Sequence, residues 1–292
     1  MTSRHKIEPH MNKRRSEICG LIRGFQTRGF TIIELLVVIS ILGLISSIAL
    51  ANLESAKSKA KEAAGKQFHA TLQRTLGVDT IARWEFDETT GDMAYDSSGN
   101  NLSGTITGAT RTLDGISGSA LSFDGGDYIS GNGFSNSNGN GNATVAVWIN
   151  PTDPVGSNTI FHVGDASCTV LEAGITGGRV YATHDTVGVP TLSNRVVSNN
   201  IWQNLTIVFS NYSTYDVYIN GAKVDSVTNP GLNNGCPSVS WSIGARTDHT
   251  SGFNGLMDSL QVYGVSLTAT EVWKVYAQGI RNMASSTTLV SI

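Results

Sequence analysis

The sequence lacks most of the motifs on which enzymes depend. It has no H-E-x-x-H zinc motif, no G-x-S-x-G nucleophile turn and no glycine-rich phosphate loop. Cysteine and proline are also scarce, with 3 and 6 residues in a chain of 292. The missing motifs argue against metalloprotease, serine hydrolase and nucleotide-dependent chemistry. We therefore expect a protein that is not an enzyme.

Charge is almost absent from residues 30 to 51. Glu34 is the only ionisable side chain in these 22 residues. As a helix they would be about 33 Å long, which is enough to cross a bilayer core of about 30 Å. A carboxylate in lipid is costly unless it has a partner. The segment predicts a membrane-spanning helix in which Glu34 needs a specific partner.

The first 29 residues are basic, and translation can begin at Met1 or at Met11. They carry seven Lys and Arg against two Glu, a net charge of +5. An excess of basic residues before a membrane span places the N-terminus in the cytoplasm and sends the rest of the chain outward. Because topology explains this charge, we expect no nucleic-acid partner.

The sequence around the start of the apolar segment carries a recognisable signal. Arg28-Gly29 followed by Phe30-Thr31-Ile32-Ile33-Glu34 resembles the processing site of type IV prepilins and pseudopilins. The resemblance implies that a prepilin peptidase removes the leader, residues 1–29, by cutting between Gly29 and Phe30. In that family the new N-terminal residue, here Phe30, is then N-methylated. It also implies that Glu34 of one filament subunit pairs with the Phe30 amine of another, which favours one axial stagger.

Two simpler alternatives exist for the same segment. One is an uncleaved signal anchor, in which the Glu34 side chain reaches the lipid headgroups. The other is a secretory signal peptide, which fits poorly because the apolar run is longer than the usual 7–15 residues or so.

Residues 52–77 continue the helix with an amphipathic pattern. Apolar residues recur there at spacings of three and four, and no proline occurs between Phe30 and Gly77. Residues 30–77 therefore predict one helix of about 47 residues, roughly 70 Å long. In the pilin family such a helix is the N-terminal spine. The absence of the mid-span proline of many major pilins favours a minor pilin or a pseudopilin.

Residues 78–292 have a different character, with 18 acidic and 8 basic residues and abundant Gly, Asn, Ser and Thr. Short alternating runs of β-branched and aromatic residues predict an antiparallel all-β sandwich over residues 78–280. Asn220-Gly221 predicts a tight hairpin, and the capping-box spacing of Thr268 and Glu271 predicts a short helix after the last strand. The tail, residues 281–292, is expected to fray or to add an edge strand.

A series of segments in this region resembles a laminin G-like, concanavalin A-like jelly roll. In order, they are Trp84–Glu88, Asp96–Asn100, Gly118–Gly125, Ala146–Ile149, Trp202, Val217–Lys223, Gly255–Tyr263 and Leu267–Val272. The resemblance implies a jelly-roll sandwich, a fold that hosts lectins, adhesion modules and hydrolases alike. Glycosidases of this fold carry their carboxylates as E-x-D-x-E on one strand, and no such run occurs here. This absence again argues against catalysis.

The jelly-roll resemblance also implies a structural calcium ion. Related sandwiches hold it with an aspartate of the last long strand and with oxygens of early loops. Carried over to this chain, the ligands would be Asp96, Asn100 and Asp258, with Asp87 as a further one. The alternative is that Asp96 only makes an Asx-turn and that Asp258 is a solvated strand residue.

Removal of the leader would remove Cys19 and leave Cys168 and Cys236. Two cysteines in an exported domain predict one disulfide, worth about 2–4 kcal/mol, provided that their Cα atoms lie within about 7 Å. Two unpaired buried thiols are the alternative.

Together these features predict a non-enzymatic subunit of a type IV pilus or of a type II secretion pseudopilus. It would be a single-pass protein of the bacterial inner membrane that enters a periplasmic or cell-surface filament. Its partners would be the prepilin peptidase, copies of itself or other pilins, and a glycan or surface ligand of the sandwich. The alternative is a membrane-tethered carbohydrate-binding protein or carbohydrate-active enzyme that does not form filaments.

Overall fold

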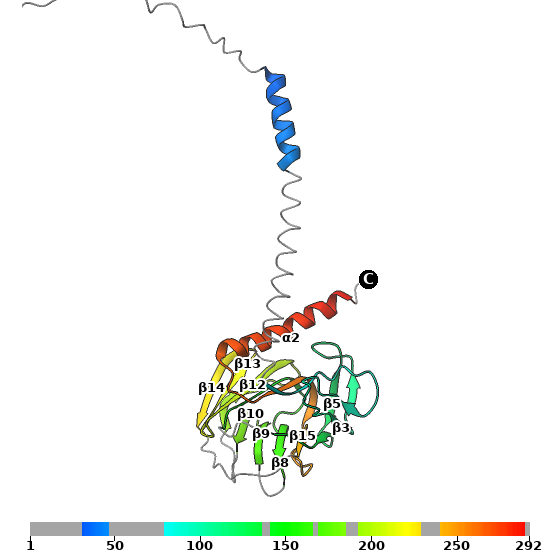
Figure 1. Cartoon of the computed structure of the whole chain (residues 1–292), viewed down its shortest axis with the longest axis vertical. Helices are drawn as coiled ribbons and strands as arrows, with labels where there is room; N and C mark the ends of the chain where they lie inside the picture. The colour runs from blue at the N-terminus through cyan, green and yellow to red at the C-terminus, as the bar shows by residue number, and fades with distance from the viewer. Residues whose placement is uncertain are drawn as a thin grey trace, which may run out of the picture. The chain divides into compact units, whose positions relative to one another are not determined.

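The computed structural model describes residues 31–46, 79–135, 141–165, 169–184, 192–228 and 240–289. The chain divides into two compact units, Met1–Ala64 and Gly65–Ile292 (Figure 1). In the first unit, residues 32–46 form an α-helix with exposed side chains. None of the described helices is both long and apolar enough to cross a bilayer. The long helix predicted for residues 30–77 is thus confirmed only over this part. Thr31 directly precedes it, and Phe30 and residues 47–77 lie outside the described residues.

This helix begins with a capping box. Thr31 donates from its backbone N–H and its hydroxyl to Oε2 of Glu34, both at 2.9 Å, and the Glu34 N–H donates to the Thr31 hydroxyl at 3.2 Å. A free N–H at a helix start is commonly satisfied in this way. The carboxylate that was expected to await another subunit therefore already has a partner within its own helix.

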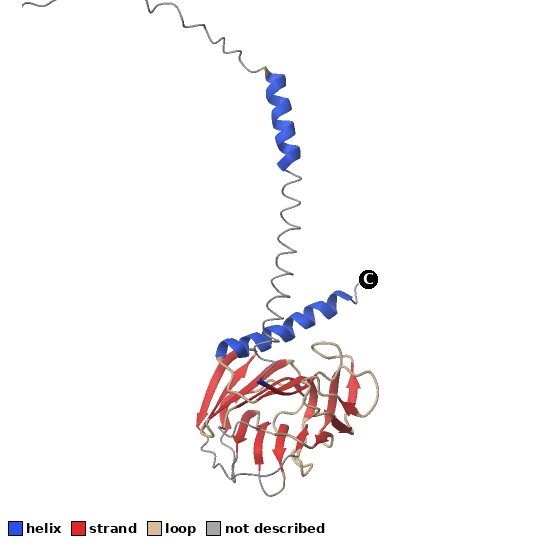
Figure 2. Ribbon diagram, in the orientation of Figure 1, coloured by secondary structure: helices blue, strands red, loops and turns tan. Residues whose placement is uncertain are grey.

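The second unit is a sandwich of two antiparallel sheets (Figure 2). The first sheet has the order β14-β13-β12-β7-β16-β5-β4, with β1 also paired to β16. Its strands are β1 (Thr80–Trp84), β4 (Thr110–Thr112), β5 (Ala120–Asp124), β7 (Ala143–Pro151), β12 (Gln203–Ser210), β13 (Thr214–Ile219), β14 (Ala222–Thr228) and β16 (Asn254–Tyr263).

The second sheet has the order β11-β10-β9-β8-β15-β6-β3-β2. Its strands are β2 (Met93–Ala94), β3 (Gly104–Thr107), β6 (Tyr128–Gly131), β8 (Asn158–Gly164), β9 (Thr169–Thr176), β10 (Arg179–His184), β11 (Leu192–Val196) and β15 (Trp241–Ile243). The sandwich predicted from the alternating pattern is confirmed.

One apolar core fills the space between the sheets, and strand alternation explains its composition. Trp84, the last residue of β1, and Phe86, two residues beyond it, are fully buried. Trp84 packs against Trp241 of the second sheet, with ring centroids 4.7 Å apart. The β13–β14 hairpin also forms as predicted. Asn220 and Gly221 both have positive φ, 51° and 74°, as a type I′ turn requires.

Helix α2 (Ala269–Leu289) covers the outer face of the first sheet (Figure 1). Its capping box is confirmed, since the Thr268 N–H and hydroxyl both donate to Oε2 of Glu271 at 2.8 Å. Val272 and Val275 are buried against a cluster made of Ala146, Val208, Tyr218, Tyr263 and Leu267. The expectation of a short helix with a frayed or strand-like tail was wrong. No proline interrupts residues 269–289, so the helix continues to Leu289.

Candidate functional site

Several predicted site residues lie outside the described residues. These are the processing residues Gly29 and Phe30, and the cysteines Cys168 and Cys236. The cleavage site and the disulfide therefore stay predictions. The remaining predicted residues, Glu34 and the four proposed calcium ligands, can be located.

Asp96 and Asn100 hold one turn together. The Asp96 carboxylate accepts backbone N–H groups of Arg83 at 3.0 Å, Ser98 at 2.8 Å and Leu102 at 2.9 Å. Asn100 donates its amide to the carbonyl oxygens of Thr80 and Ile81. Partial burial opposes the charge of Asp96, but these hydrogen bonds outweigh burial and lower its pKa. The Ser98 bond is the Asx-turn that was considered as the alternative to calcium.

Asp258 and Asp87 hold a different loop. Asp258 is fully buried in β16, and its Oδ2 accepts the N–H groups of Ile116 at 2.7 Å and Ser117 at 3.0 Å. Asp87 accepts the N–H of Ser119 at 2.9 Å. Burial raises the pKa of Asp258 to about 7, and the negative charge of Asp87 adds to this shift. Asp258 is therefore not the solvated strand residue of the alternative reading.

The four residues do not fit one calcium site. A calcium ion needs six to eight oxygen ligands or so, whereas these carboxylates are turned toward N–H donors of two separate loops. Over the described ranges, no three His, Cys, Asp or Glu side chains gather in a way that could hold a metal. The calcium prediction is left without support.

A groove lies on the outer face of the second sheet and has a volume of about 470 Å³. Its lining comes from β3, β6, β15 and the segments beside them: Ser103, Thr105, Ser130, Gly131, Asn132, Ser240, Trp241 and Thr247. Strand register explains the chemistry, because residues that pair across strands share one face. Thr105 pairs with Ser130, Ser130 with Ser242, Ser242 with His162, and His162 with Glu172. A polar row thus crosses five strands.

His162 supports one wall of the groove. Its ring is almost fully buried, with Nε2 3.3 Å from the hydroxyl of Thr169 and Nδ1 3.3 Å from the hydroxyl of Thr247. Burial, assisted by the charge of Arg246, lowers the pKa of His162 to about 4. The imidazole is therefore neutral near pH 7 and holds Thr247 by hydrogen bonds alone.

Glu172 and Arg246 form an ion pair beside this histidine. The carboxylate is 2% exposed and accepts from Nη1 of Arg246 at 2.8 Å, from the Tyr181 hydroxyl at 2.9 Å and from the Thr159 hydroxyl at 3.2 Å. Burial raises the pKa of Glu172, and the charge of Arg246 opposes that rise. Three donors, one of them the cation Arg246, make Glu172 a structural carboxylate that anchors the loop of Arg246 and Thr247.

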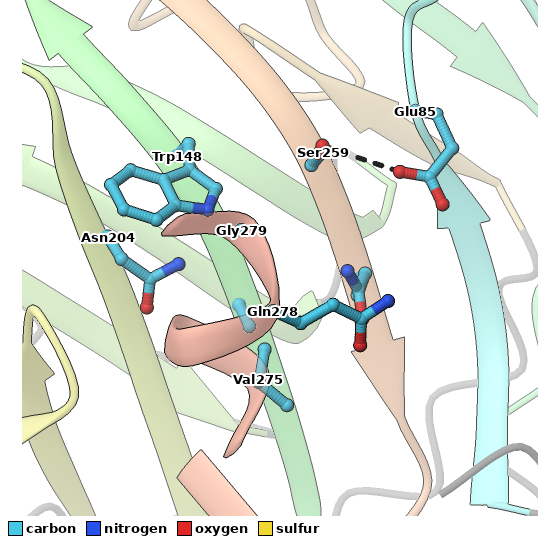
Figure 3. Close-up of a pocket in the computed structure, with 9 residues that line it drawn as sticks. Glu85, Trp148, Asn204, Ser259, Val275, Gln278 and Gly279 are labelled. Atoms are coloured by element: carbon cyan, nitrogen blue, oxygen red, sulfur yellow. Dashed lines mark hydrogen bonds between the residues drawn. The ribbon is translucent and has the colours of Figure 1, made fainter. Parts of the chain in front are cut away.

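A second, smaller cavity lies between α2 and the first sheet (Figure 3). Figure 3 shows Trp148 beside Gly279 of α2, and Ser259 directed at Glu85. The cavity volume is about 20 Å³, which accommodates about one water molecule. This space is too small for a ligand of any size, so the groove is the better candidate for a binding site.

None of the groove residues was predicted as a site. Small hydroxyl residues on alternate strand positions are typical of any solvated sheet face, and they carry no signal of their own. Only the strand register, which joins residues from 103 to 247, turns them into one surface.

Comparison with known sequences supports both resemblances. Residues 123–273, more than half of the chain, match the family model of the concanavalin A-like lectin/glucanases superfamily. The chain belongs to this superfamily. Residues 25–50 match the prokaryotic N-terminal methylation motif, and this range includes Gly29, Phe30 and Glu34. This lectin-like domain is thus carried on a chain with a prepilin-type N-terminus. No curated protein matches the sequence.

Several solved structures share the fold of this chain at low sequence identity. One is domain 4 of AbnA, a GH43 extracellular arabinanase from Geobacillus stearothermophilus, in complex with arabinotriose. It is 22% identical, with a TM-score of 0.50, over 68% of this chain and 98% of that chain. Another is the binding domain of botulinum neurotoxin DC in complex with rat synaptotagmin II. It is 14% identical, with a TM-score of 0.56, over 70% of this chain. The match covers 52% of the toxin domain, so this chain spans about half of its length.

Proposed function

We propose that this chain is a pilin-like subunit, minor pilin or pseudopilin, of a type IV pilus or a type II secretion pseudopilus. A prepilin peptidase cleaves it between Gly29 and Phe30. It is held in the inner membrane by its N-terminal helix until it joins a filament with other pilins or copies of itself. The observation that carries this proposal is the methylation motif at residues 25–50, ahead of a lectin-like domain in the same chain.

The test is the N-terminus of the mature protein. Mass spectrometry of chain recovered from membranes and from sheared filaments is expected to find N-methylated Phe30 as the first residue. Chains that retain Arg28, or that begin elsewhere, would overturn the proposal and leave an anchored sandwich. A Gly29→Leu variant is the matched control, because it keeps the charge and the apolar span but removes the small residue at the cleavage site.

We further propose that the displayed sandwich binds carbohydrate and has no catalytic activity. Support comes from the superfamily and from the AbnA domain solved with arabinotriose. The missing E-x-D-x-E run supports the absence of glycosidase activity. Purified full-length chain in detergent, tested with arabinotriose and longer arabinan, should bind without releasing product. Product release would instead favour the tethered carbohydrate-active enzyme.

A further inference from the structure

The groove on the second sheet is chemically uniform. The described residues of its lining are five Ser or Thr residues, one Asn, one Gly and one Trp, and none of these carries a charge. Hydroxyls and amides both donate and accept hydrogen bonds, as sugar hydroxyls do. An anionic ligand would need Arg or Lys, and an extended peptide would need a free sheet edge or apolar side-chain pockets. The lining matches a neutral, hydroxyl-rich ligand.

The size of the groove suits a ligand rather than a single water. Its volume of about 470 Å³ lies within the range of about 300–1,000 Å³ typical of ligand sites. The groove also crosses strands β3, β6 and β15 instead of ending in a closed hole. A chain-like ligand can therefore lie across it.

The polar groups of the groove are held in place before any ligand arrives. The Thr247 hydroxyl lies 3.3 Å from His162 Nδ1 and 3.1 Å from the Gly164 carbonyl oxygen. The Ser240 hydroxyl donates to Asn132 Oδ1 at 2.9 Å. Side chains that are already ordered lose little conformational entropy on binding.

Trp241 turns its indole ring to the core side of the second sheet, where the ring packs against that of Trp84 with centroids 4.7 Å apart. It lines the groove and is fully buried, and its indole N–H has no hydrogen-bond partner in the described part of the chain. The ring lies close against β6, because a Cβ on Gly131 would be 2.3 Å from Trp241 Cζ2. The indole N–H therefore faces the interior of the sandwich, across the sheet from the outer face, and is not a donor for a ligand in the groove.

We infer that this groove is the carbohydrate site of the sandwich and that its ligand is a neutral polysaccharide chain, bound by hydroxyl hydrogen bonds without a metal ion. The inference rests on the proposed carbohydrate binding and adds its location and the class of ligand. Among the described residues, none that lines the groove carries a carboxylate, so the proposed binding uses neutral donors and acceptors.

The test compares a blocking variant with a matched control on the same strand. Thr105→Tyr places a ring in the groove, whereas Thr107→Tyr makes the same change two residues along the same face of β3, outside the lining. Both positions are exposed, so both variants should fold, as circular dichroism would verify. Purified full-length chains are assayed against immobilised linear arabinan, xylan and dextran, and against alginate and polygalacturonate, once with EDTA and once with calcium.

The wild type should bind at least one neutral polysaccharide in EDTA, and Thr105→Tyr should weaken this binding by about tenfold or more, the equivalent of losing one or two hydrogen bonds. Thr107→Tyr should bind as the wild type does. If Thr105→Tyr binds as well as the wild type, the groove is not the binding site, although the protein still binds carbohydrate. Binding only to the acidic polymers, or only with calcium, would overturn the ligand class. Binding to none of the five would overturn carbohydrate binding itself.

Discussion

The guanidinium of Arg246 lies 2.8 Å from the carboxylate of Glu172, although 74 residues separate them in the sequence. Arg246 is one-third exposed, whereas Glu172 is buried in β9. The pair ties the loop that carries Thr247 to the second sheet. It therefore sets one wall of the groove.

Removal of Arg246 should leave Glu172 buried without its cation. We expect Arg246→Met to lower the free energy of unfolding by about 2–3 kcal/mol at pH 7, less than for a fully buried pair because water reaches Arg246. The pKa of Glu172, already raised by burial, would rise further. A carboxyl with a raised folded-state pKa is stabilising at low pH and loses this contribution as pH increases. The loss of unfolding free energy caused by Arg246→Met, measured by urea titration, should thus be smaller at pH 4 than at pH 7.

Arg195→Met is the matched control for this prediction, since Arg195 is exposed on β11. It should change the free energy of unfolding by less than about 0.5 kcal/mol. A similar effect of both substitutions would contradict a specific role for the ion pair.

Asp258 should make the stability of the sandwich depend on pH. Its folded-state pKa of about 7 lies above the ordinary value of 3.8. Its contribution is therefore complete below about pH 4 and is lost as pH rises toward 7, by up to about 4 kcal/mol. Asp258→Asn keeps an acceptor for the Ile116 N–H but cannot ionise, so its urea midpoint should vary much less between pH 4 and pH 8.

Asp114 provides the comparison for Asp258, because it is an exposed aspartate of the same loop. Asp114→Asn should keep the wild-type pH profile. If Asp258→Asn also keeps it, the buried carboxyl does not control the stability of this loop.

The close contact between α2 and Trp148 should require a glycine at position 279. A Cβ at this position would lie 2.4 Å from Nε1 of Trp148. On an open helix surface, Gly→Ala stabilises by up to about 1 kcal/mol, but overpacking here should destabilise by about 1–3 kcal/mol. The measurement is the change in free energy of unfolding on Gly279→Ala, alone and with Trp148→Leu.

The double variant separates the clash from other effects. With the indole removed, Gly279→Ala should become neutral or stabilising, which gives a coupling energy between the two sites. A destabilisation that persists without the indole would show that Gly279 matters for another reason.

Glu34 should be needed for filament assembly and not for insertion or cleavage. Glu34→Leu should be cleaved after Gly29 and remain in the membrane, yet be absent from sheared filaments, because the Phe30 amine of a neighbour would lack its counter-charge. Thr31→Val removes the capping hydroxyl but keeps the carboxylate. It should still enter filaments. Equal incorporation of Glu34→Leu and the wild type would favour a tethered protein that does not polymerise.

Features that depend on neighbouring residues were predictable. The Asn220-Gly221 turn and the Thr268–Glu271 capping box formed as expected, because each needs only local backbone geometry. The inward position of Trp84 fits the alternation of β1, whereas Phe86 lies beyond the end of this strand with a φ of 61°. The length of α2 did not follow, since the polar residues after Ala277 gave no signal that the helix would continue.

Features that depend on distant residues were not predictable. Asp96 and Asp258 were assigned to one calcium site, yet they hold two loops by backbone hydrogen bonds. Either arrangement suits an aspartate, and only the approach of the loop around Ile116 to β16 selects between them. Burial of Glu172 likewise required the partner Arg246.

The amino-acid sequence by itself determined the prepilin-type N-terminus, the change to a β-rich region and the superfamily of the sandwich, since composition, periodicity and local motifs carry these properties. Tertiary structure alone decided which polar residues meet. Strand register brings Thr105, Ser130 and Thr247 onto one groove, and folding places Asp258 among N–H groups. The physical reason is that register and burial arise from contacts between distant strands, which no local pattern encodes.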